Sequence, residues 1–289
     1  MHFFVIGCNG MAGHMISIYL KENGHTVLGF ARKDQRHVPC IVGNVYDTKL
    51  LSSIISSSKF DYIINCIGLL NTDAEKNKAD AVYLNAYFPH FLTELTRQTE
   101  TRVIHISTDC VFSGKKGSYK VDDFRDGETF YDRSKALGEI QDSKNITLRN
   151  SIIGPDINSN GIGLLNWFLQ QKNTINGYTG SIWTGQTTLQ LAKTIEFIAI
   201  HHITGIYNSV PQSIISKFDL LRLFNIYFKS SIINVLPIEG VKADKSLIPS
   251  KFPIDYCIPD YEQMIQELAI WLFDHKNIYP HYDLSKIKK

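Results

Sequence analysis

Short apolar runs alternate with amphipathic stretches along the first half of the chain. The runs fall at residues 3–6, 26–30, 62–68, 102–108 and 146–150, with a further short one from residue 40. Stretches of helical periodicity separate them, near 14–22, 48–56, 77–99 and around Tyr131. Strands that are apolar on both faces and joined through helices indicate right-handed βαβ crossovers and a parallel sheet. We therefore predict an α/β fold, a Rossmann-type doubly wound parallel sheet.

The pattern becomes less regular after residue 150. A turn-rich loop at 156–163 precedes a short helix at 164–171 and an aromatic, glycine-rich stretch at 177–185. A helix at 189–201, a strand at 205–210 and two amphipathic helices, 216–228 and 261–276, follow. We predict a dinucleotide-binding domain at 1–150, to which 184–212 returns, and a smaller substrate-binding region made of 151–183 and 213–289.

A glycine turn lies between the first strand and the first helix. Gly7, Gly10 and Gly13 follow the strand at a spacing of G-x-x-G-x-x-G. Glycine permits a tight turn and a close approach of backbone to a pyrophosphate, and the free N–H groups of the helix start bind anions. The turn predicts a dinucleotide site, against the alternative of a tight strand–helix turn without a ligand. From it we expect cofactor contacts by Gly7, Asn9, Gly10 and Met11.

The ends of the next strands supply the other expected cofactor contacts. Arg32 and Lys33 follow the second strand, where a cation can hold the 2′-phosphate of NADP. These two cations favour NADPH as the cofactor. Asp34 comes next, and a carboxylate at the end of this strand can bind the ribose 2′-hydroxyl of NAD, so NADH remains possible. An exposed basic loop is the alternative. Because ligands lie beyond the carboxyl ends of parallel strands, we also expect contacts by Asn44, Val45, Cys66, Ile67 and Gly68.

Tyr131 and Lys135 are four residues apart on one predicted helix, so they share a face. An ammonium beside a phenol favours the phenolate, so we expect Lys135 to lower the pKa of Tyr131 and let it transfer a proton near neutral pH. The alternative is an exposed helix with an aromatic and a cation in register. Alone, this motif is weak; it gains weight after a glycine turn.

Four motifs together resemble the extended short-chain dehydrogenases/reductases, most of all the dTDP-4-dehydrorhamnose reductase group of nucleotide-sugar reductases. They are the glycine turn, residues 65–68, Ser-Thr-Asp at 107–109 within 106–114, and Tyr-x-x-x-Lys at 131–135 followed by Gly-Glu. The resemblance covers residues 1–155 well and the remainder loosely.

The resemblance implies a catalytic set and a reaction. Thr108 would bind the carbonyl oxygen, with Ser107 left open as the alternative because adjacent strand residues face opposite sides. Tyr131 would donate the proton and Asn85 would support a proton relay. Tyr131 and Lys135 would also contact the cofactor, Lys135 by holding the nicotinamide ribose. The implied reaction is NADPH-dependent reduction of the 4-keto group of a nucleotide-activated 6-deoxy sugar, in surface-polysaccharide precursor synthesis.

The sequence departs from the reductase pattern where the sugar should bind. Cys110 stands where the family usually has Tyr after Ser-Thr-Asp, and 183–188 lacks the usual Asp-Gln and Pro-Thr pairs. A divergent branch acting on UDP-linked acetamido sugars is one reading. An aromatic ring can stack on a base and an arginine can pair with a diphosphate; packing in the core is the alternative for each residue. The expected substrate contacts are Asp109, Cys110, Val111, Arg149, Asn150, Trp167, Tyr178 and Trp183.

Composition limits the classes of function that remain open. A net charge of +2 over 289 residues indicates no nucleic-acid partner. Five scattered cysteines without a Cys-x-x-Cys pair favour a reducing cytoplasm and no metal site, and we expect no membrane helix. A homodimer is an expectation from the family only. Two rival functions stay open: an epimerase of the same fold, and a non-catalytic NADP-sensing subunit; the missing Glu after Asp109 disfavours a dehydratase.

Overall fold

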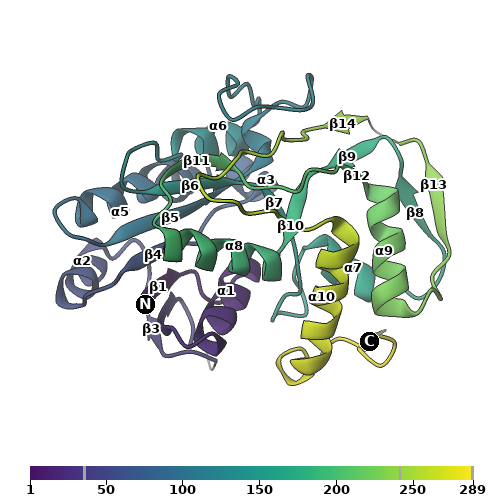
Figure 1. Cartoon of the computed structure of the whole chain (residues 1–289), viewed down its shortest axis with the longest axis horizontal. Coiled ribbons are helices and arrows are strands. Elements are labelled where there is room, and N and C mark those ends of the chain that lie inside the picture. The colour runs from purple at the N-terminus through teal and green to yellow at the C-terminus, as the bar shows by residue number, and fades with distance from the viewer. Residues whose placement is uncertain (35–36, 241, 288–289) are drawn as a thin grey trace.

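The computed structural model describes residues 1–34, 37–240 and 242–287, and a seven-stranded parallel sheet forms its centre (Figure 1). The strand order is β11-β6-β5-β4-β1-β2-β3, and every neighbouring pair is parallel. The strands are β1 (His2–Ile6), β2 (Thr26–Ala31), β3 (Cys40–Val42), β4 (Tyr62–Asn65), β5 (Arg102–Ser107), β6 (Ile146–Arg149) and β11 (Gly205–Asn208).

Helices cover both faces of this sheet. Because side chains alternate along a strand, Phe3 and Val5 of β1 pack with α1 (Met11–Glu22) and α8 (Thr188–His201). Phe4 and Ile6 point the other way, into a second cluster with α2 (Thr48–Ser57) and α5 (Phe88–Thr96). The predicted doubly wound α/β fold is confirmed.

The helical segment before β5 is broken, whereas a single helix near 77–99 was expected. It consists of α3 (Asn71–Lys76), α4 (Lys78–Ala81), a π-helical turn η1 (Val82–Tyr87) and α5. Asn85 lies in η1. A π-turn widens the helix by one residue and is frequent at functional sites, and here it borders the helix that carries Tyr131.

That helix, α6 (Phe130–Leu137), begins at a capping box. Thr129 accepts a hydrogen bond from the backbone N–H of Asp132, and the Asp132 carboxylate accepts one from the N–H of Thr129. This reciprocal cap fixes the first turn, in which Tyr131 lies. The short helix η2 (Asp109–Val111) directly follows β5.

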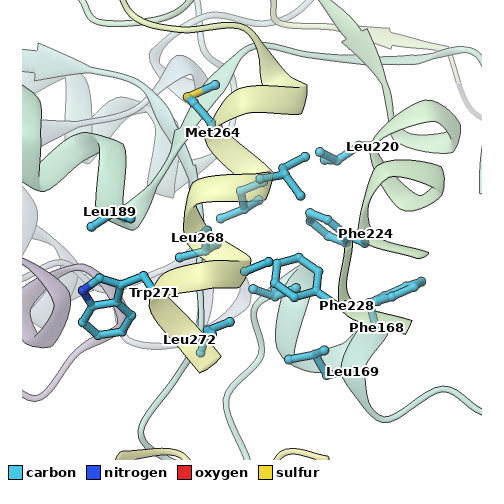
Figure 2. Packing of buried hydrophobic residues seen from close by; sticks show 14 of the residues in the cluster. Phe168, Leu169, Leu189, Leu220, Phe224, Phe228, Met264, Leu268, Trp271 and Leu272 are labelled. Atoms are coloured by element: carbon cyan, nitrogen blue, oxygen red, sulfur yellow. The ribbon is translucent and has the colours of Figure 1, made fainter. Parts of the chain in front are cut away.

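A second core lies in the C-terminal part, between α7 (Leu164–Leu169), α9 (Lys217–Lys229) and α10 (Tyr261–Asp274). Figure 2 shows α10 between Leu189 of α8 on one side and Leu220 and Phe224 of α9 on the other. A short helix, η3 (Lys276–Ile278), follows α10. Small strands that the sequence did not predict complete this part: β7 (Ser151–Ile153), β8 (Ile175–Tyr178), β9 (Ser181–Trp183), β10 (Gly185–Thr187), β12 (Ile215–Ser216), β13 (Val235–Ile238) and β14 (Ala243–Asp244).

The chain returns to the large sheet through α8 and β11. β11 pairs with β6 at the sheet edge, and α8 packs beside α1. The division into two functional domains stays a prediction. Within the part of the chain that the structure describes, every helix is too short or too polar to cross a bilayer.

Candidate active site

The glycine turn has the shape that a bound pyrophosphate requires. Gly7 has φ +87°, and a Cβ there would lie 3.0 Å from Ile67. A Cβ on Gly13 would lie 2.1 Å from the carbonyl oxygen of Gly7, so helix α1 approaches β1 more closely than a side chain allows. The N-cap of α1 is Gly10, without a side-chain cap, so the first N–H groups are available to an anion.

A cleft of about 650 Å³ lies along the carboxyl ends of β1, β2 and β4. Of the expected cofactor residues, the following line it: Gly7, Asn9, Gly10, Arg32, Lys33, Asn44, Val45, Cys66, Ile67 and Gly68. Met11, Tyr131 and Lys135 are not among the lining residues. Sequence reasoning missed Phe30, Tyr46, Leu69, Leu84, Ile157 and Asn158, and the last two come from an irregular loop that carries no motif.

Polar groups in the cleft fit a phosphorylated dinucleotide. Arg32 and Lys33 are exposed at the end of β2. The Asn9 amide donates to the backbone oxygen of Lys33 at 3.0 Å, but its own buried Oδ1 has no hydrogen-bond partner among the described residues. An unpaired buried acceptor is costly unless a ligand donates to it, so the cleft offers both cations and an acceptor to a bound group.

Thr108 and Ser107 point to opposite sides of the end of β5. The Thr108 hydroxyl donates to Asp109 at 3.0 Å and accepts from the N–H of Cys110 at 3.1 Å, and it favours ionisation of the Tyr131 phenol by lowering its pKa. The Ser107 hydroxyl donates instead to buried Glu139 at 2.8 Å. The structure therefore brings Thr108, and not Ser107, to Tyr131.

The expected lowering of the Tyr131 pKa by Lys135 is wrong for this structure. Tyr131 is 7% exposed, and burial raises the pKa of its phenol well above the ordinary value, with Cys110 adding to the rise and the Thr108 hydrogen bond opposing it. The Lys135 ammonium donates to the Ile106 carbonyl at 2.8 Å and lies 3.4 Å from Nε2 of His105. Burial lowers the pKa of Lys135 to about 8. Burial is therefore the main cause of both pKa shifts, upward for Tyr131 and downward for Lys135.

Asn85 links the loop after β4 to α6 through hydrogen bonds. Its amide donates to the Leu69 carbonyl at 2.9 Å and to the Ser134 hydroxyl at 3.0 Å, and its oxygen accepts from the Leu69 N–H at 2.8 Å. A Cβ on Gly138 would lie 1.8 Å from the Asn85 carbonyl oxygen, so only glycine lets α6 lie this close. These contacts give Asn85 a positioning role, while the predicted proton relay stays a prediction.

Three expected substrate residues surround the end of β5. Asp109 is buried, and Cys110 is partly buried beside it. Asn150 follows Arg149, whose partner in the β5–β6 register is Ser107, so Asn150 lies level with Thr108. Its carboxamide is buried, and within the described part of the chain neither the nitrogen nor the oxygen has a hydrogen-bond partner. A ligand at the end of β5 could therefore satisfy both polar atoms of Asn150.

Three other expected substrate residues are held by the protein itself. Arg149 is buried in a bidentate ion pair with Glu139 and also donates to the Val121 carbonyl, so it is not free to bind a diphosphate. Val111 is fully buried in a hydrophobic cluster, and Trp183 is 4% exposed and packs against Tyr261. The predictions for these three side chains are therefore corrected to structural roles.

Trp167 and Tyr178 are 41% and 46% exposed on α7 and β8. Tyr178 lies against Gly240, whose Cβ would come within 2.0 Å of the ring. Their predicted stacking on a base stays a prediction.

Two lysines that sequence reasoning missed approach the site from the C-terminal part. Lys245 lies 3.6 Å from Asp132 of α6, and both Lys245 and Lys217 act electrostatically on Asp109. Burial raises the pKa of Asp109, and these cations and the Thr108 hydrogen bond counter the rise. Neither lysine belongs to a motif, so no local signal could have identified them.

Comparison with known proteins places the chain in a family. Residues 1–153 match the RmlD substrate binding domain model. The chain is 24% identical over 296 residues to dTDP-4-dehydrorhamnose reductase of Aggregatibacter actinomycetemcomitans, covering 95% of this chain and 97% of that one. It is 27% identical to a probable low-salt glycan biosynthesis reductase of Haloferax volcanii, over 76% and 77% of the two chains.

A solved structure shares the fold across nearly the whole length. The dTDP-4-dehydrorhamnose reductase of Bacillus anthracis, in complex with NADP, superposes with a TM-score of 0.78 at 18% identity, over 93% of this chain and 99% of that one. The family predicted from the motifs is confirmed. The chain therefore belongs to the RmlD substrate binding domain family and is an NAD(P)-dependent oxidoreductase of the extended short-chain dehydrogenase/reductase type.

Proposed function

We propose that the chain uses NADPH to reduce the 4-keto group of a nucleotide-activated 6-deoxy sugar in the synthesis of surface-polysaccharide precursors. The observation that carries the proposal is that Thr108, the N-cap of η2 at the end of β5, lies beside Tyr131: η2 packs against α6, and the Thr108 hydroxyl lowers the pKa of the Tyr131 phenol. Lys135 follows one turn later on α6. The names of the relatives, a dTDP-4-dehydrorhamnose reductase and a glycan biosynthesis reductase, support it.

The cleft supplies the cofactor contacts. Arg32 and Lys33 would bind a 2′-phosphate, the first turn of α1 would bind the pyrophosphate, and Asn9 would accept a hydrogen bond through its unpaired oxygen. The bound NADPH supplies the hydride. Orientation and electrostatics come from the protein.

Tyr131 is the proton donor. Because burial raises its pKa, the phenol stays protonated throughout the neutral range, which is the form that reduction of a ketone requires. Thr108 hydrogen-bonds the carbonyl oxygen and directs it toward the phenol. Lys135 holds the ribose, and the unpaired amide of Asn150 binds the sugar beside the reacting centre. Positioned proton transfer of this kind contributes about 10²–10⁴-fold to a rate.

The proposed substrate carries dTDP or UDP. We propose that residues 151–183 and 213–289 bind the nucleotide sugar, while 1–150 with 184–212 binds the dinucleotide. Cys110, where relatives usually have Tyr, and the altered 183–188 segment favour a sugar other than the common dTDP-linked one, a UDP-linked 4-keto-6-deoxy acetamido sugar being the second candidate.

NADPH oxidation with dTDP- and UDP-linked 4-keto-6-deoxy sugars tests the proposal. We expect one NADPH consumed per sugar reduced, and a loss of about 10²-fold or more in Tyr131→Phe at saturating NADPH. Interconversion of sugars without net NADPH use would identify an epimerase instead. Tight NADPH binding with no turnover on any of these sugars would favour a sensor.

A further inference from the structure

Lys217 is held where a lysine is unfavourable. It is the first residue of α9, directly after the N-cap Ser216. A cation in the first turn opposes the helix dipole, which favours acidic residues there. Its ammonium lies 5.5 Å from the ring centroid of buried Trp183, over the aromatic face. The contact with the ring offsets part of this cost and also fixes the direction of the side chain.

The ring under Lys217 lies beside the strand end that carries Asn150. A Cβ on Gly185 would come within 2.4 Å of the Trp183 ring and 2.3 Å of the carbonyl oxygen of Ser151, which directly follows Asn150.

Burial lowers the pKa of Lys217, and Asp109 and Cys110 oppose that shift. These two residues directly follow Thr108. Lys217 therefore acts electrostatically on the end of the catalytic strand, although it lies 109 positions after Thr108 in the sequence.

The hydrogen-bonding capacity of Lys217 is unused. Lys245, which also acts on Asp109, has an ion-pair partner in Asp132 at 3.6 Å. Among the residues that the structure describes, Lys217 has no hydrogen-bond or ion-pair partner of its own. An ammonium has three donors, and those of Lys217 have no hydrogen-bond partner among the described residues, so a ligand oxygen could accept from this partly buried group.

We propose that Lys217 contacts the substrate, donating a hydrogen bond to an oxygen substituent of the sugar beside the reacting carbonyl. This inference rests on the proposed function, since it assigns part of that site. A hydroxyl suits this position better than a diphosphate, because a hydroxyl can accept from Lys217 and donate to a carboxyl oxygen of Asp109 at the same time, whereas a diphosphate can only accept.

Titration calorimetry in the presence of NADP⁺ can distinguish a contact with the sugar from a contact with the nucleotide, by comparing the affinity for a nucleotide sugar with that for the nucleotide alone. The probes are dTDP-rhamnose and dTDP alone, with a UDP-linked 6-deoxy sugar and UDP in parallel. The variants are Lys217→Met, which keeps the length of the side chain without donors, Lys217→Arg, which keeps the cation, and Lys242→Met. Lys242 is an exposed lysine paired with Glu239 at 3.3 Å and serves as the matched control.

We expect Lys217→Met to weaken binding of the nucleotide sugar by about 10- to 100-fold, as for one hydrogen bond from a charged donor. Binding of the nucleotide alone should stay unchanged, Lys217→Arg should retain more affinity than Lys217→Met, and Lys242→Met should match the wild type. Equal weakening of nucleotide and nucleotide sugar would place the ammonium on the diphosphate and overturn the proposal. So would an unchanged affinity in Lys217→Met, or a wild type that binds neither sugar.

The proposed reductase function can fail while the proposed Lys217 contact holds. A wild type that binds the nucleotide sugar through Lys217 but consumes no NADPH with the 4-keto sugars would overturn the reductase function and leave the Lys217 contact standing.

Discussion

Arg149 and Glu139 form a bidentate ion pair beneath the catalytic residues. Nε donates to Oε1 and Nη2 to Oε2, both at 2.7 Å, and both side chains are almost fully buried. Ser107 and Arg125 also donate to this carboxylate, at 2.8 and 2.9 Å. Because Glu139 follows α6 while Ser107 and Arg149 end β5 and β6, the pair ties the Tyr131 helix to the two strands at the site.

Arg149→Met should therefore destabilise the fold. Removing one partner leaves the Glu139 charge buried without its main donor, which costs about 3–5 kcal/mol. Urea denaturation at pH 7 measures the free energy of unfolding. The double variant Arg149→Met/Glu139→Leu should recover part of the loss, because replacing a whole buried pair by apolar groups costs less than breaking it. A single variant as stable as the wild type would contradict this role.

The same pair predicts a loss of stability in acid. Burial opposes ionisation of Glu139, but the hydrogen bond and charge of Arg149 outweigh it, so its folded pKa lies below the ordinary value. Its contribution is present above the unfolded pKa of about 4.3 and is lost as pH falls through the lower folded pKa. We expect the stability difference between wild type and Glu139→Gln to shrink below about pH 4. A difference independent of pH would contradict the assignment.

Thr108→Ala and Ser107→Ala should have opposite effects. The Thr108 hydroxyl acts on the Tyr131 phenol, so its loss should lower kcat by about 10²-fold or more with little change in stability. The Ser107 hydroxyl donates to buried Glu139 instead, so its loss should cost about 1–3 kcal/mol of stability and leave kcat within a few-fold. Steady-state kinetics and thermal melts of both variants decide this. A larger kcat effect in Ser107→Ala would reverse the assignment of the two hydroxyls.

The sequence could predict the sheet and its ligand edge for a simple reason. Strands such as 3–6 are apolar on both faces, and in a parallel sheet their carboxyl ends meet at one edge. Gly7, Arg32, Asn44 and Gly68 follow four such strands, and all of them line the cleft. To predict that these residues lie close together, one needs to know only the order and direction of the strands.

The same reasoning failed where the partner of a side chain decides its role. Arg149 lies at the correct strand end, but Glu139 takes its guanidinium. Trp183 is aromatic and near the site in sequence, yet it fills the core under Lys217. The strands at 175–187 are three or four residues long, and β8 and β10 contain glycine, so alternation had too few positions to reveal them.

Arg32 and Lys33 predict the cofactor preference. Changing both to alanine should raise KM for NADPH by about 10-fold or more, since a charged contact to a phosphate is worth about 1.5–3 kcal/mol. KM for NADH should change little, because NADH lacks the 2′-phosphate. Lys21→Ala, at an exposed lysine that donates to the His37 carbonyl, is the control. Equal effects on both cofactors would place these cations on the pyrophosphate instead.

Lys135 should contribute to activity at the expense of stability. Its ammonium is buried, and burial lowers its folded pKa to about 8, against about 10.4 in the unfolded chain. At pH 7 the fold therefore holds a charge that it disfavours. Lys135→Met should lose about 10²-fold or more in kcat and gain thermal stability at pH 7.

This gain in stability should depend on pH. Between about pH 8 and 10.4 the unfolded chain holds the Lys135 proton and the folded chain does not, so the stability of the wild type rises with pH and the advantage of the variant should shrink. Thermal melts of both proteins across this range measure it, with Lys242→Met as the exposed control. A variant less stable than the wild type at pH 7 would show that the hydrogen bond from Lys135 to Ile106 outweighs the cost of burying the charge.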